Sequence, residues 1–349
     1  MNPRQKLTLT AAGLLLLALS VVLWPSSRQP VPSAGSSERS RPVNRAPKPV
    51  AAPLPPRRAK DFQTFAKLAA KDQFPKLTRQ EIDTYLEAQH RSAGSLLAAF
   101  RLIHDEALLR EAMEKFPHDP QVQLASLQIT GDPAKRLEIL ESFKLSNPGN
   151  GLGNGLAAQA LLDLGKTEEA FAELSQSIGK PFDEMTLATS QNEEEAYLSA
   201  GFSPVEAKMA AMNELGRPLV INLRKIADHL KALRGTYAAA GDDAAVQATR
   251  DIQTGLGLHL QSGGGIVDEM VGMVFENGAL KGVDTPEARA RLAELKLQNQ
   301  SMVDKARKIP VLMENPAVPE SDWLLYFDRA KLFGEKAAND WMLEKYPGL

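Results

Sequence analysis

The sequence predicts an all-α protein, on two observations. Apolar residues recur at three- and four-residue spacing through nearly all of residues 61–349, which is the period of an amphipathic helix, and strand-like alternation is confined to residues 279–283. Turn glycines also recur, at intervals of 34, 36 and 40 residues. They are Gly131, Gly165, Gly201 and Gly241. Because such intervals are typical of stacked helical repeats, we expect an irregular α-solenoid of helical hairpins.

Residues 1–24 predict a membrane anchor. Leu7–Trp24 is an uncharged run that follows Arg4 and Lys6, and as a helix it would span about 27 Å, close to the hydrocarbon thickness of a bilayer. We interpret it as an uncleaved, single-pass signal anchor, because no small-residue cleavage site follows and the cysteine of a lipoprotein signal is absent. The bulk of the chain would then be extracytoplasmic. Cleavage of the segment would instead make the protein secreted or periplasmic.

Residues 25–58 predict a disordered, proline-rich basic linker. This stretch holds nine prolines and very few aliphatic side chains, so it cannot bury a core of its own. Extended at about 3.1 Å per residue, it would hold a folded body up to roughly 100 Å from the membrane. Its positive charge also fits a second interpretation, which is attraction to anionic lipid headgroups or to an acidic cell-wall polymer.

Residues 59–349 predict one helical body with two halves, a repeat-like half over 59–217 and an atypical half over 218–349. Pro133 and Pro204 fall at first-turn positions of predicted helices, where a missing N–H removes no helical hydrogen bond. The predicted hairpins are Ser92–Phe116, Val122–Leu145, Leu152–Ile178, Asp183–Leu215 and Pro218–Gln261.

The hairpin Leu152–Ile178 has the clearest pattern. Gly165 supplies the left-handed residue that ends its first helix. Thr167 is the expected cap of the second helix, with Glu168 and Glu169 at the positive end of the helix dipole. Each helix is expected to carry one apolar stripe. The stripes consist of Ala157, Leu161 and Leu164 in the first helix and of Ala170, Phe171, Leu174 and Ile178 in the second.

The turn of this hairpin resembles a known repeat family. Residues 164–170 read LGKTEEA, with the small Ala158 upstream, and this segment is similar to the central turn of a tetratricopeptide repeat (TPR). The tract Asp228–Phe275 is similar to a region of membrane-tethered, uncharacterised helical-repeat proteins of planctomycete and verrucomicrobial type. Both resemblances imply a TPR-like solenoid, and the second also implies a bacterial envelope setting. Neither implies functional residues.

The atypical half departs from the repeat pattern. A longer helical pair, Asn222–Ala240 and Ala244–Gln261, precedes a glycine break at 263–265 and a helix over Ile266–Phe275. A further helix begins at Thr285 and extends to about Lys308. The prolines beyond it predict an extended crossing to a last helical region over residues 321–346. These prolines are Pro310, Pro316 and Pro319.

No constellation in the sequence predicts chemistry, so we expect no catalytic, cofactor-binding or metal-ligating residues and no cofactor. The chain has no cysteine, which excludes disulfides, thiol nucleophiles and cysteine-based metal sites. The histidines lack the spacing of metal ligands on a helix and are interpreted as surface or core residues. They are His90, His104, His118, His229 and His259.

Three other features are interpreted as structural. Gly149–Gly155 resembles a phosphate cradle but lacks a preceding strand and a Lys-Ser/Thr ending, so we expect a flexible inter-repeat loop. The acidic clusters Glu193–Glu195 and Asp242–Asp243 are interpreted as helix-start charges. The densest aromatic group is expected to cap the open end of the solenoid rather than to form a peptide or glycan platform. It consists of Trp323, Tyr326, Phe327, Phe333, Trp341 and Tyr346.

The leading functional hypothesis is a membrane-anchored, non-enzymatic scaffold or adaptor of the bacterial cell envelope. It would bind a protein or peptide partner through a helical-repeat groove. Nucleic acid is not an expected partner, because residues 59–349 hold 32 basic and 42 acidic residues out of 41 and 43 in the whole chain. The sequence does not define an oligomeric state.

The alternative is an envelope enzyme or a dedicated folding helper with its site in residues 218–349. The order of anchor, linker and helical body resembles the layout of lipase-specific foldases. Phe327-Asp328 and Gly334-Glu335 match only part of the foldase signature and lie at the wrong end of the chain. Convergent acids or histidines in the second half would favour the enzyme, whereas a continuous groove across several hairpins would favour the binding module.

Overall fold

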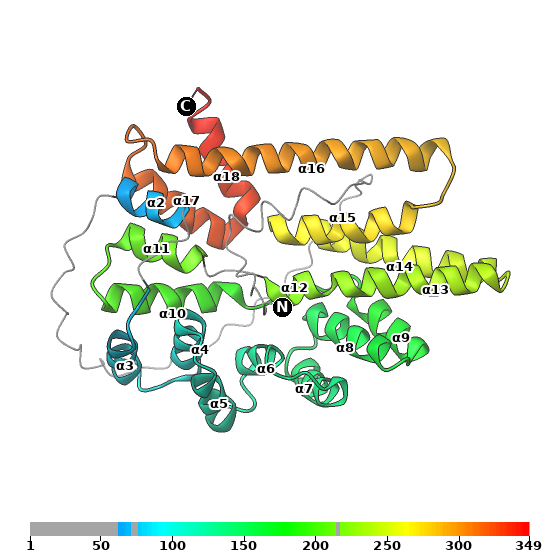
Figure 1. The fold of residues 1–349 in the computed structure, drawn as a ribbon, viewed down its shortest axis with the longest axis horizontal. Coiled ribbons are helices and arrows are strands. Elements are labelled where there is room, and N and C mark those ends of the chain that lie inside the picture. Colours follow the sequence, from blue (N-terminus) through cyan, green and yellow to red (C-terminus); the bar gives the residue numbers. More distant parts are fainter. Residues whose placement is uncertain (1–61, 71–75, 214–216, 349) are drawn as a thin grey trace, which may run out of the picture.

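The computed structural model describes residues 62–70, 76–213 and 217–348, and over these residues the protein is all-helical, without strands (Figure 1). The predicted fold class is therefore confirmed at the level of an all-α body. The predicted anchor, 1–24, and linker, 25–58, lie outside the described residues. Among the helices of the described ranges, none has the length and apolar character needed to cross a bilayer.

The first part of the described chain runs from α2 to α11. Its helices are α2 (Phe62–Ala70), α3 (Arg79–Ala88), α4 (Ala93–Ile103), α5 (Glu106–Lys115), α6 (Pro120–Ser126), α7 (Pro133–Ser146), α8 (Gly151–Asp163), α9 (Thr167–Ser177), α10 (Thr186–Ser199) and α11 (Pro204–Asn213). The second part runs from α12 to α18. Its helices are α12 (Pro218–Asn222), α13 (Arg224–Ala239), α14 (Asp243–Gln261), α15 (Ile266–Leu280), α16 (Pro286–Met313), α17 (Glu320–Phe333) and α18 (Glu335–Lys345).

Helix starts and ends follow local side-chain chemistry. The side chains of Ser92, Asp119 and Asp132 cap α4, α6 and α7 by accepting hydrogen bonds from first-turn backbone N–H groups. Gly165 and Gly201 adopt φ angles of +74° and +83°, the left-handed conformation that ends a helix most easily at glycine. The first four predicted hairpins match consecutive helix pairs, whereas Pro218–Gln261 contains three helices, α12, α13 and α14.

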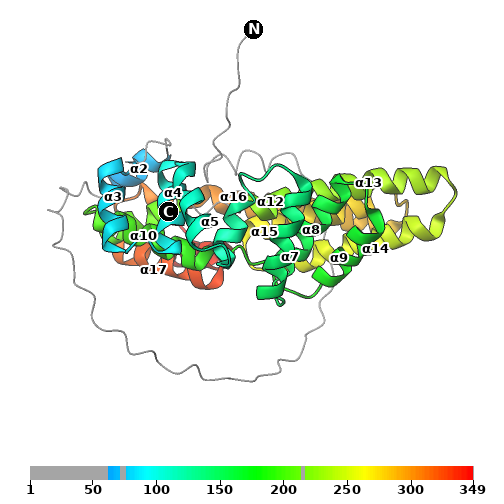
Figure 2. The same ribbon diagram turned by 90° about the horizontal axis from the view of Figure 1, so that it is seen from below.

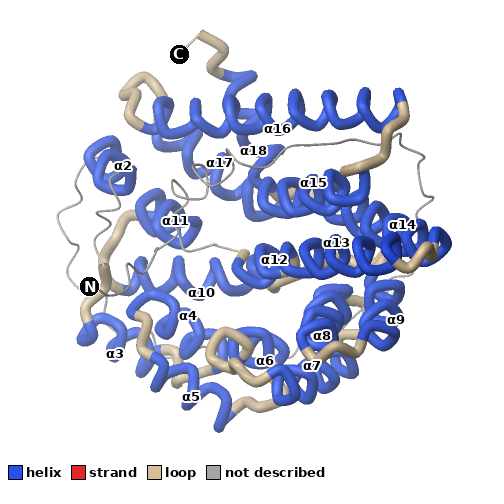
Figure 3. The backbone as a smooth tube through the Cα atoms, turned by 45° about the vertical axis from the view of Figure 1, so that its right-hand side comes forward, coloured by secondary structure: helices blue, strands red, loops and turns tan. Residues whose placement is uncertain are grey.

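The helices enclose two main cores. Lobe 1 consists of α2–α5, α10, α11, α17 and α18, and lobe 2 consists of α7–α9 and α12–α15. Helix α6 contributes to both cores, and α16 extends along both lobes (Figure 1). The two lobes lie side by side in Figure 2. Figure 3 shows α3–α9 as an arc on one side of the row formed by α10, α12 and α13, with α15 and α16 on the other side. The C-terminal helices pack beside the first described helix, since α16 contacts α2 and Trp323 of α17 packs against Phe62 of α2, and α17 also contacts α11.

The glycine-rich stretch 149–155 is not the flexible loop that we expected. Residues 151–155 form the first turns of α8, which Asn150 caps by accepting a hydrogen bond from the backbone N–H of Leu152. The glycines allow close packing, because a Cβ at Gly151 would lie 2.8 Å from the Ser177 carbonyl oxygen and one at Gly153 would lie 2.8 Å from Phe143 Cδ1. The expected single apolar stripe of α8 is also wrong, because residues 151–162 are all buried between α7, α9 and α13.

Several smaller predictions are corrected. Thr167 does not cap α9. The N-cap residue of α9 is Lys166, and no side chain accepts a capping hydrogen bond at that position. Glu193–Glu195 lie within α10 rather than at a helix start, because that helix begins at Thr186. Pro310 does not begin an extended crossing but lies inside α16, where the buried Ile309 and Leu312 hold the last turn against lobe 1.

The aromatic group does not form a separate cap. Trp323, fully buried in α17, packs against Phe62 of α2 with ring centroids 5.7 Å apart. Tyr326 and Phe327 lie in the same cluster, at 5.4 and 6.3 Å from Trp323. These rings join the end of the chain to the beginning of its described part, so the predicted open end is closed by internal packing. Phe333 lies outside this cluster and is 60% exposed.

Candidate functional site

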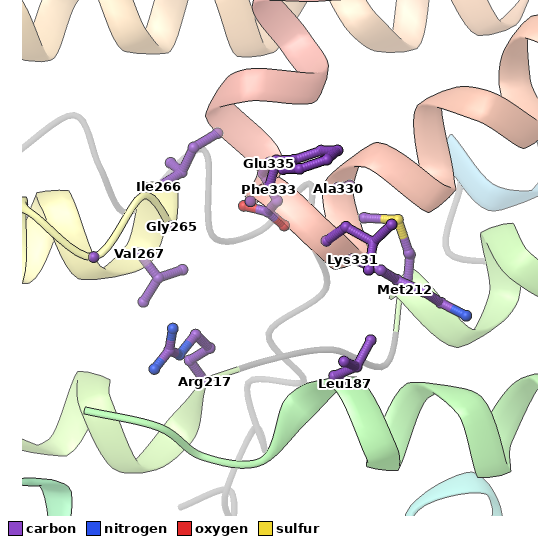
Figure 4. Close-up of a pocket in the computed structure, with 13 residues that line it drawn as sticks. Leu187, Met212, Arg217, Gly265, Ile266, Val267, Ala330, Lys331, Phe333 and Glu335 are labelled. Carbon is purple, nitrogen blue, oxygen red and sulfur yellow. The ribbon is translucent and has the colours of Figure 1, made fainter. Parts of the chain in front are cut away.

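A cavity of about 310 Å³ lies where the two lobes meet (Figure 4). Its walls come from the start of α10, the end of α11, the start of α12, the α14–α15 loop and the α17–α18 junction. The residues that line it are Leu187, Met212, Arg217, Gly263, Gly265, Ile266, Val267, Ala330, Lys331, Leu332, Phe333, Gly334 and Glu335. Because it combines apolar walls with a few charged groups, it has the composition of a ligand site.

Glycines shape the wall where the α14–α15 loop meets the α17–α18 junction. Gly264 and Gly334 have φ angles of +78° and +86°, which L side chains rarely adopt. A Cβ at Gly334 would lie 2.5 Å from the Gly264 carbonyl oxygen. The two backbones are therefore too close for a residue with a side chain at position 334. A Cβ at Gly265 would collide with the carboxylate of Asp268. These glycines bring the start of α18 next to the start of α15.

The rim of the pocket is apolar and open to solvent. Leu187, Leu332 and Phe333 are 49%, 65% and 60% exposed, although each is a large hydrophobic side chain. Met212, Ile266 and Val267 are partly buried beside them. The rim is therefore a gathering of exposed and partly buried apolar groups from α10, α11, α15 and α17, the kind of surface that marks a binding site.

The floor is charged, and Arg217 is its centre. Its guanidinium donates to the carboxylate of Asp268 and, at 2.5 Å, to the carbonyl oxygen of Phe182. Glu184 lies 3.9 Å from Arg217 Nε and accepts a hydrogen bond of 2.6 Å from the backbone N–H of Val220. Asp268 and Glu184 are buried behind the pocket wall, with exposures of 3% and 8%. Arg217 thus connects α15 to the loop before α10.

Burial controls the ionisation of the carboxyl groups around Arg217. It raises the pKa of Glu184 to about 7 and that of Asp268 to about 6, and in both cases the positive charge of Arg217 opposes part of the increase. Burial also raises the pKa of Glu335, the first residue of α18. Arg217 opposes this increase as well, and the charge of Asp268 adds to it. The three groups therefore hold protons more tightly than exposed carboxyls do.

Lys331 contributes little free charge to the pocket. Its ammonium pairs with Glu194 of α10, which also lies 3.2 Å from Lys208 Nζ. Lys208 in turn pairs with Asp328 at 2.5 Å. In Figure 4 the Lys331 side chain extends away from Glu335 and Arg217. This network ties α10, α11 and α17 together, and Glu194 acts there as a structural ion-pair partner.

The other residues considered in the sequence lie apart from the pocket. His90 and His104 occupy turns with positive φ, and His229 Nε2 lies 3.1 Å from Asp163 Oδ1. His259 contacts the Lys180 carbonyl oxygen. Asp242 caps α14, which agrees with its predicted role as a helix-start charge. Within the described ranges, no three histidine, aspartate or glutamate side chains are grouped so as to hold a metal ion.

Sequence reasoning missed the floor of the pocket. Arg217, Asp268 and Glu335 come from distant positions in the chain and belong to no local motif. The available signals were the glycine break at 263–265 and the Gly334-Glu335 pair, both of which mark close approaches of backbone. The described lining residues provide apolar contacts, one partly exposed carboxyl group and two paired cations, and they include no hydroxyl, thiol or imidazole side chain. Comparisons with protein-family models, curated proteins and solved structures find no match for the chain.

Proposed function

We propose that the protein is a membrane-anchored, non-enzymatic interaction module of the bacterial cell envelope that binds a protein or peptide partner at the pocket between its lobes. The observation that carries this proposal is the exposed apolar rim made by Leu187, Leu332 and Phe333. Covering large apolar side chains that are already half exposed removes apolar area from water, which favours association. Aromatic residues at the centre of such surfaces often dominate the binding energy.

In this proposal the body is an irregular TPR-like solenoid, and residues 1–58 hold it at the membrane. The proposal takes the pocket at the lobe junction as the binding surface, and the groove expected along the repeats stays a prediction. The anchor Leu7–Trp24 and the linker 25–58 place the body outside the cytoplasm. Protease added to intact spheroplasts should degrade the body. Protection of the body until the membrane is disrupted would contradict this orientation.

An enzyme with its site in residues 218–349 is the second candidate, favoured by one observation. Glu335 faces the pocket and holds its proton more tightly than an exposed glutamate, which is a property of general acids. Asp268 and Glu184 lie behind the wall and are occupied by Arg217 or by backbone, so a second carboxyl group for paired acid–base work is not presented. The pocket therefore supports binding better than hydrolysis.

Site-specific photocrosslinking tests the proposed function. A benzoylphenylalanine at position 333 of the full-length protein, in the membranes of the source cells, should form a discrete adduct with one partner. The matched control is position 297, because Leu297 is 70% exposed but lies on α16 away from the pocket residues. The same adducts from both positions, or none from position 333, would contradict the proposal.

A further inference from the structure

The charges at the pocket floor are unequal in number. Three carboxyl groups, Glu335, Asp268 and Glu184, interact with the single guanidinium of Arg217. The other cation in the wall, Lys331, is paired with Glu194. If all three carboxyls ionise, the floor has more negative than positive charge. This excess is costly because the groups are largely shielded from water. Such a floor either retains protons or attracts a cation.

Two carboxylate groups lack their full set of partners. The Oδ1 atom of Asp268 is buried and has no hydrogen-bond partner among the described residues, since Arg217 engages the Oδ2 atom. The carboxylate of Glu335 likewise makes no hydrogen bond or ion pair with the residues that the structure describes, yet it lines the cavity. Leaving the buried Asp268 Oδ1 atom unpaired is costly, and Glu335 is partly exposed at the cavity, so a donor on a ligand can reach its carboxylate.

The walls restrict what that donor can be attached to. Leu187, Ile266, Val267, Leu332 and Phe333 surround the cavity with apolar surface. Lysine and arginine side chains combine an apolar stem with a charged tip, so their methylene groups can contact these walls while the tip reaches Glu335. A cavity of about 310 Å³ is large enough for a side chain and its neighbour but is small for a folded element.

Resting on the proposed function, we propose that the pocket recognises a lysine or arginine side chain of the partner peptide, next to an apolar residue. Glu335 accepts hydrogen bonds from the ammonium or guanidinium group, and Leu332 and Phe333 contact the neighbouring apolar residue. The raised pKa of Glu335 supports this assignment, because an arriving cation would favour the ionised form that the empty pocket disfavours.

A peptide selection tests the inference. A random heptapeptide display library is selected on the full-length protein in detergent, in three forms: wild type, Glu335→Gln and Glu344→Gln. Glu344 is the matched control, because it is exposed on the same helix and loses the same charge. We expect wild type and Glu344→Gln to enrich lysine or arginine beside an apolar residue, and Glu335→Gln to lose this enrichment. A preference that persists in Glu335→Gln would overturn the inference, because it would reflect general attraction to the acidic body.

Binding of one selected peptide by fluorescence anisotropy gives the quantitative test. Replacing its lysine by norleucine should weaken binding to the wild type by about tenfold or more, the size of a charge-assisted hydrogen bond, and should change binding to Glu335→Gln much less. Equal weakening in both proteins would overturn the assignment of Glu335. If Glu335→Gln fails to fold, as judged by its melting curve, the norleucine change on the wild type decides alone.

The outcomes separate this inference from the proposed function. Selected peptides without a cation, whose binding still depends on Phe333, would leave the binding module standing and refute cation recognition. A library that yields no binder able to block photocrosslinking from position 333 would contradict both. An intramolecular adduct between position 333 and residues 25–58 would show that the chain's own basic linker is the occupant, which would overturn recognition of a partner.

Discussion

Lobe 1 and lobe 2 differ in what they bury. The core of lobe 1 is rich in aromatic rings, and most of its carboxyls with shifted pKa values are held by partners: Arg91 lowers the pKa of Glu111 to about 2, and Lys345 lowers that of Asp322. The exception is Glu335 of α18, at the pocket, whose pKa is raised by burial. In lobe 2 and at its border with α16, burial raises the pKa of Glu184, Asp268 and Glu276. The buried acids of lobe 2 therefore lower the free energy of unfolding at neutral pH, because ionising a carboxyl group inside the protein is unfavourable.

The polar interior of lobe 2 is organised by arginines. Arg234 donates to Gln253 at 2.5 Å and to the Gly278 carbonyl oxygen at 2.6 Å. Arg291 donates to the buried Glu276 at 3.1 Å. Buried charges of this kind contribute little net stability but penalise any packing that leaves them unpaired. Lobe 1 therefore stabilises the framework by apolar packing, whereas lobe 2 buries charged groups, including Asp268 beneath the pocket.

The largest effect is expected from Trp323→Ala in lobe 1. Trp323 is fully buried between Phe62, Tyr326 and Phe327, so its removal should lower the free energy of unfolding by about 3–5 kcal/mol. Trp341→Ala is the control, since Trp341 is only partly buried at the edge of the same core, where Arg329 and Lys345 lie over its ring. It should cost about 1–2 kcal/mol. Equal losses in urea denaturation would show that lobe 1 does not depend on the buried aromatic cluster.

A somewhat smaller effect is expected from Ala170→Arg in lobe 2. Ala170 is fully buried where α9 packs on α8, so an arginine there overfills the contact and buries an unpaired charge, at a cost of about 2–4 kcal/mol. Glu169→Arg, one residue earlier, removes an exposed pair with Lys166 and should cost about 0.5–1 kcal/mol. Denaturant midpoints provide the comparison. A tolerated arginine at position 170 would show that this hairpin is loosely packed.

The buried acids of lobe 2 predict that stability falls as pH rises. Their pKa values are about 6–7 in the folded protein and 3.8–4.5 as free groups, so between pH 4.5 and 7 the folded state binds more protons than the unfolded state. The free energy of unfolding should therefore decrease by about 1–3 kcal/mol from pH 5 to pH 7.5. Glu184→Gln should flatten this slope, and the exposed control Glu314→Gln should not. A wild-type stability that rises over this range would contradict the role assigned to the buried acids.

The sequence predicted the framework better than the pocket, for a physical reason. Helix periodicity, capping residues and turn glycines such as Gly165 and Gly201 act over a few residues, so the pattern indicates them directly. The helical conformation of residues 151–155 was not predicted. The glycines there allow close packing against Phe143 and Ser177, and these contacts are visible only in the tertiary structure. The same reason explains the continuation of α16 through Pro310, which packing of the last turn stabilises against the cost of the proline.

The candidate site was outside the reach of local patterns. Arg217 and Asp268 are 51 positions apart in the chain, and Glu335 follows 67 positions later. Each residue is unremarkable in its own segment, as an arginine before a proline or an acid in the first turn of a helix. Only the packing of α15 and α18 around Arg217 gives them a common environment, and burial then changes their ionisation. The number and sign of the charges can be counted in the sequence, but their effect on stability depends on how deeply each group is buried.

The smallest effect, and the sharpest contrast with lobe 2, is expected at Glu111 in lobe 1. Its carboxylate accepts from Arg91 Nε at 2.7 Å and from Lys115 Nζ at 2.7 Å, and these cations lower its pKa from 4.5 to about 2. Its contribution to stability is therefore complete above pH 4.5 and is lost as the pH falls towards 2, which is the opposite sign from Glu184. Because these groups are partly exposed, solvent screening limits the effect, and Glu111→Gln should cost about 0.5–1 kcal/mol at pH 7. Urea denaturation at pH 3 and pH 7 should show a smaller difference between Glu111→Gln and wild type at the lower pH. A difference that grows as the pH falls would mean that the ion pair does not stabilise lobe 1, and the contrast between partnered and buried acids would then fail.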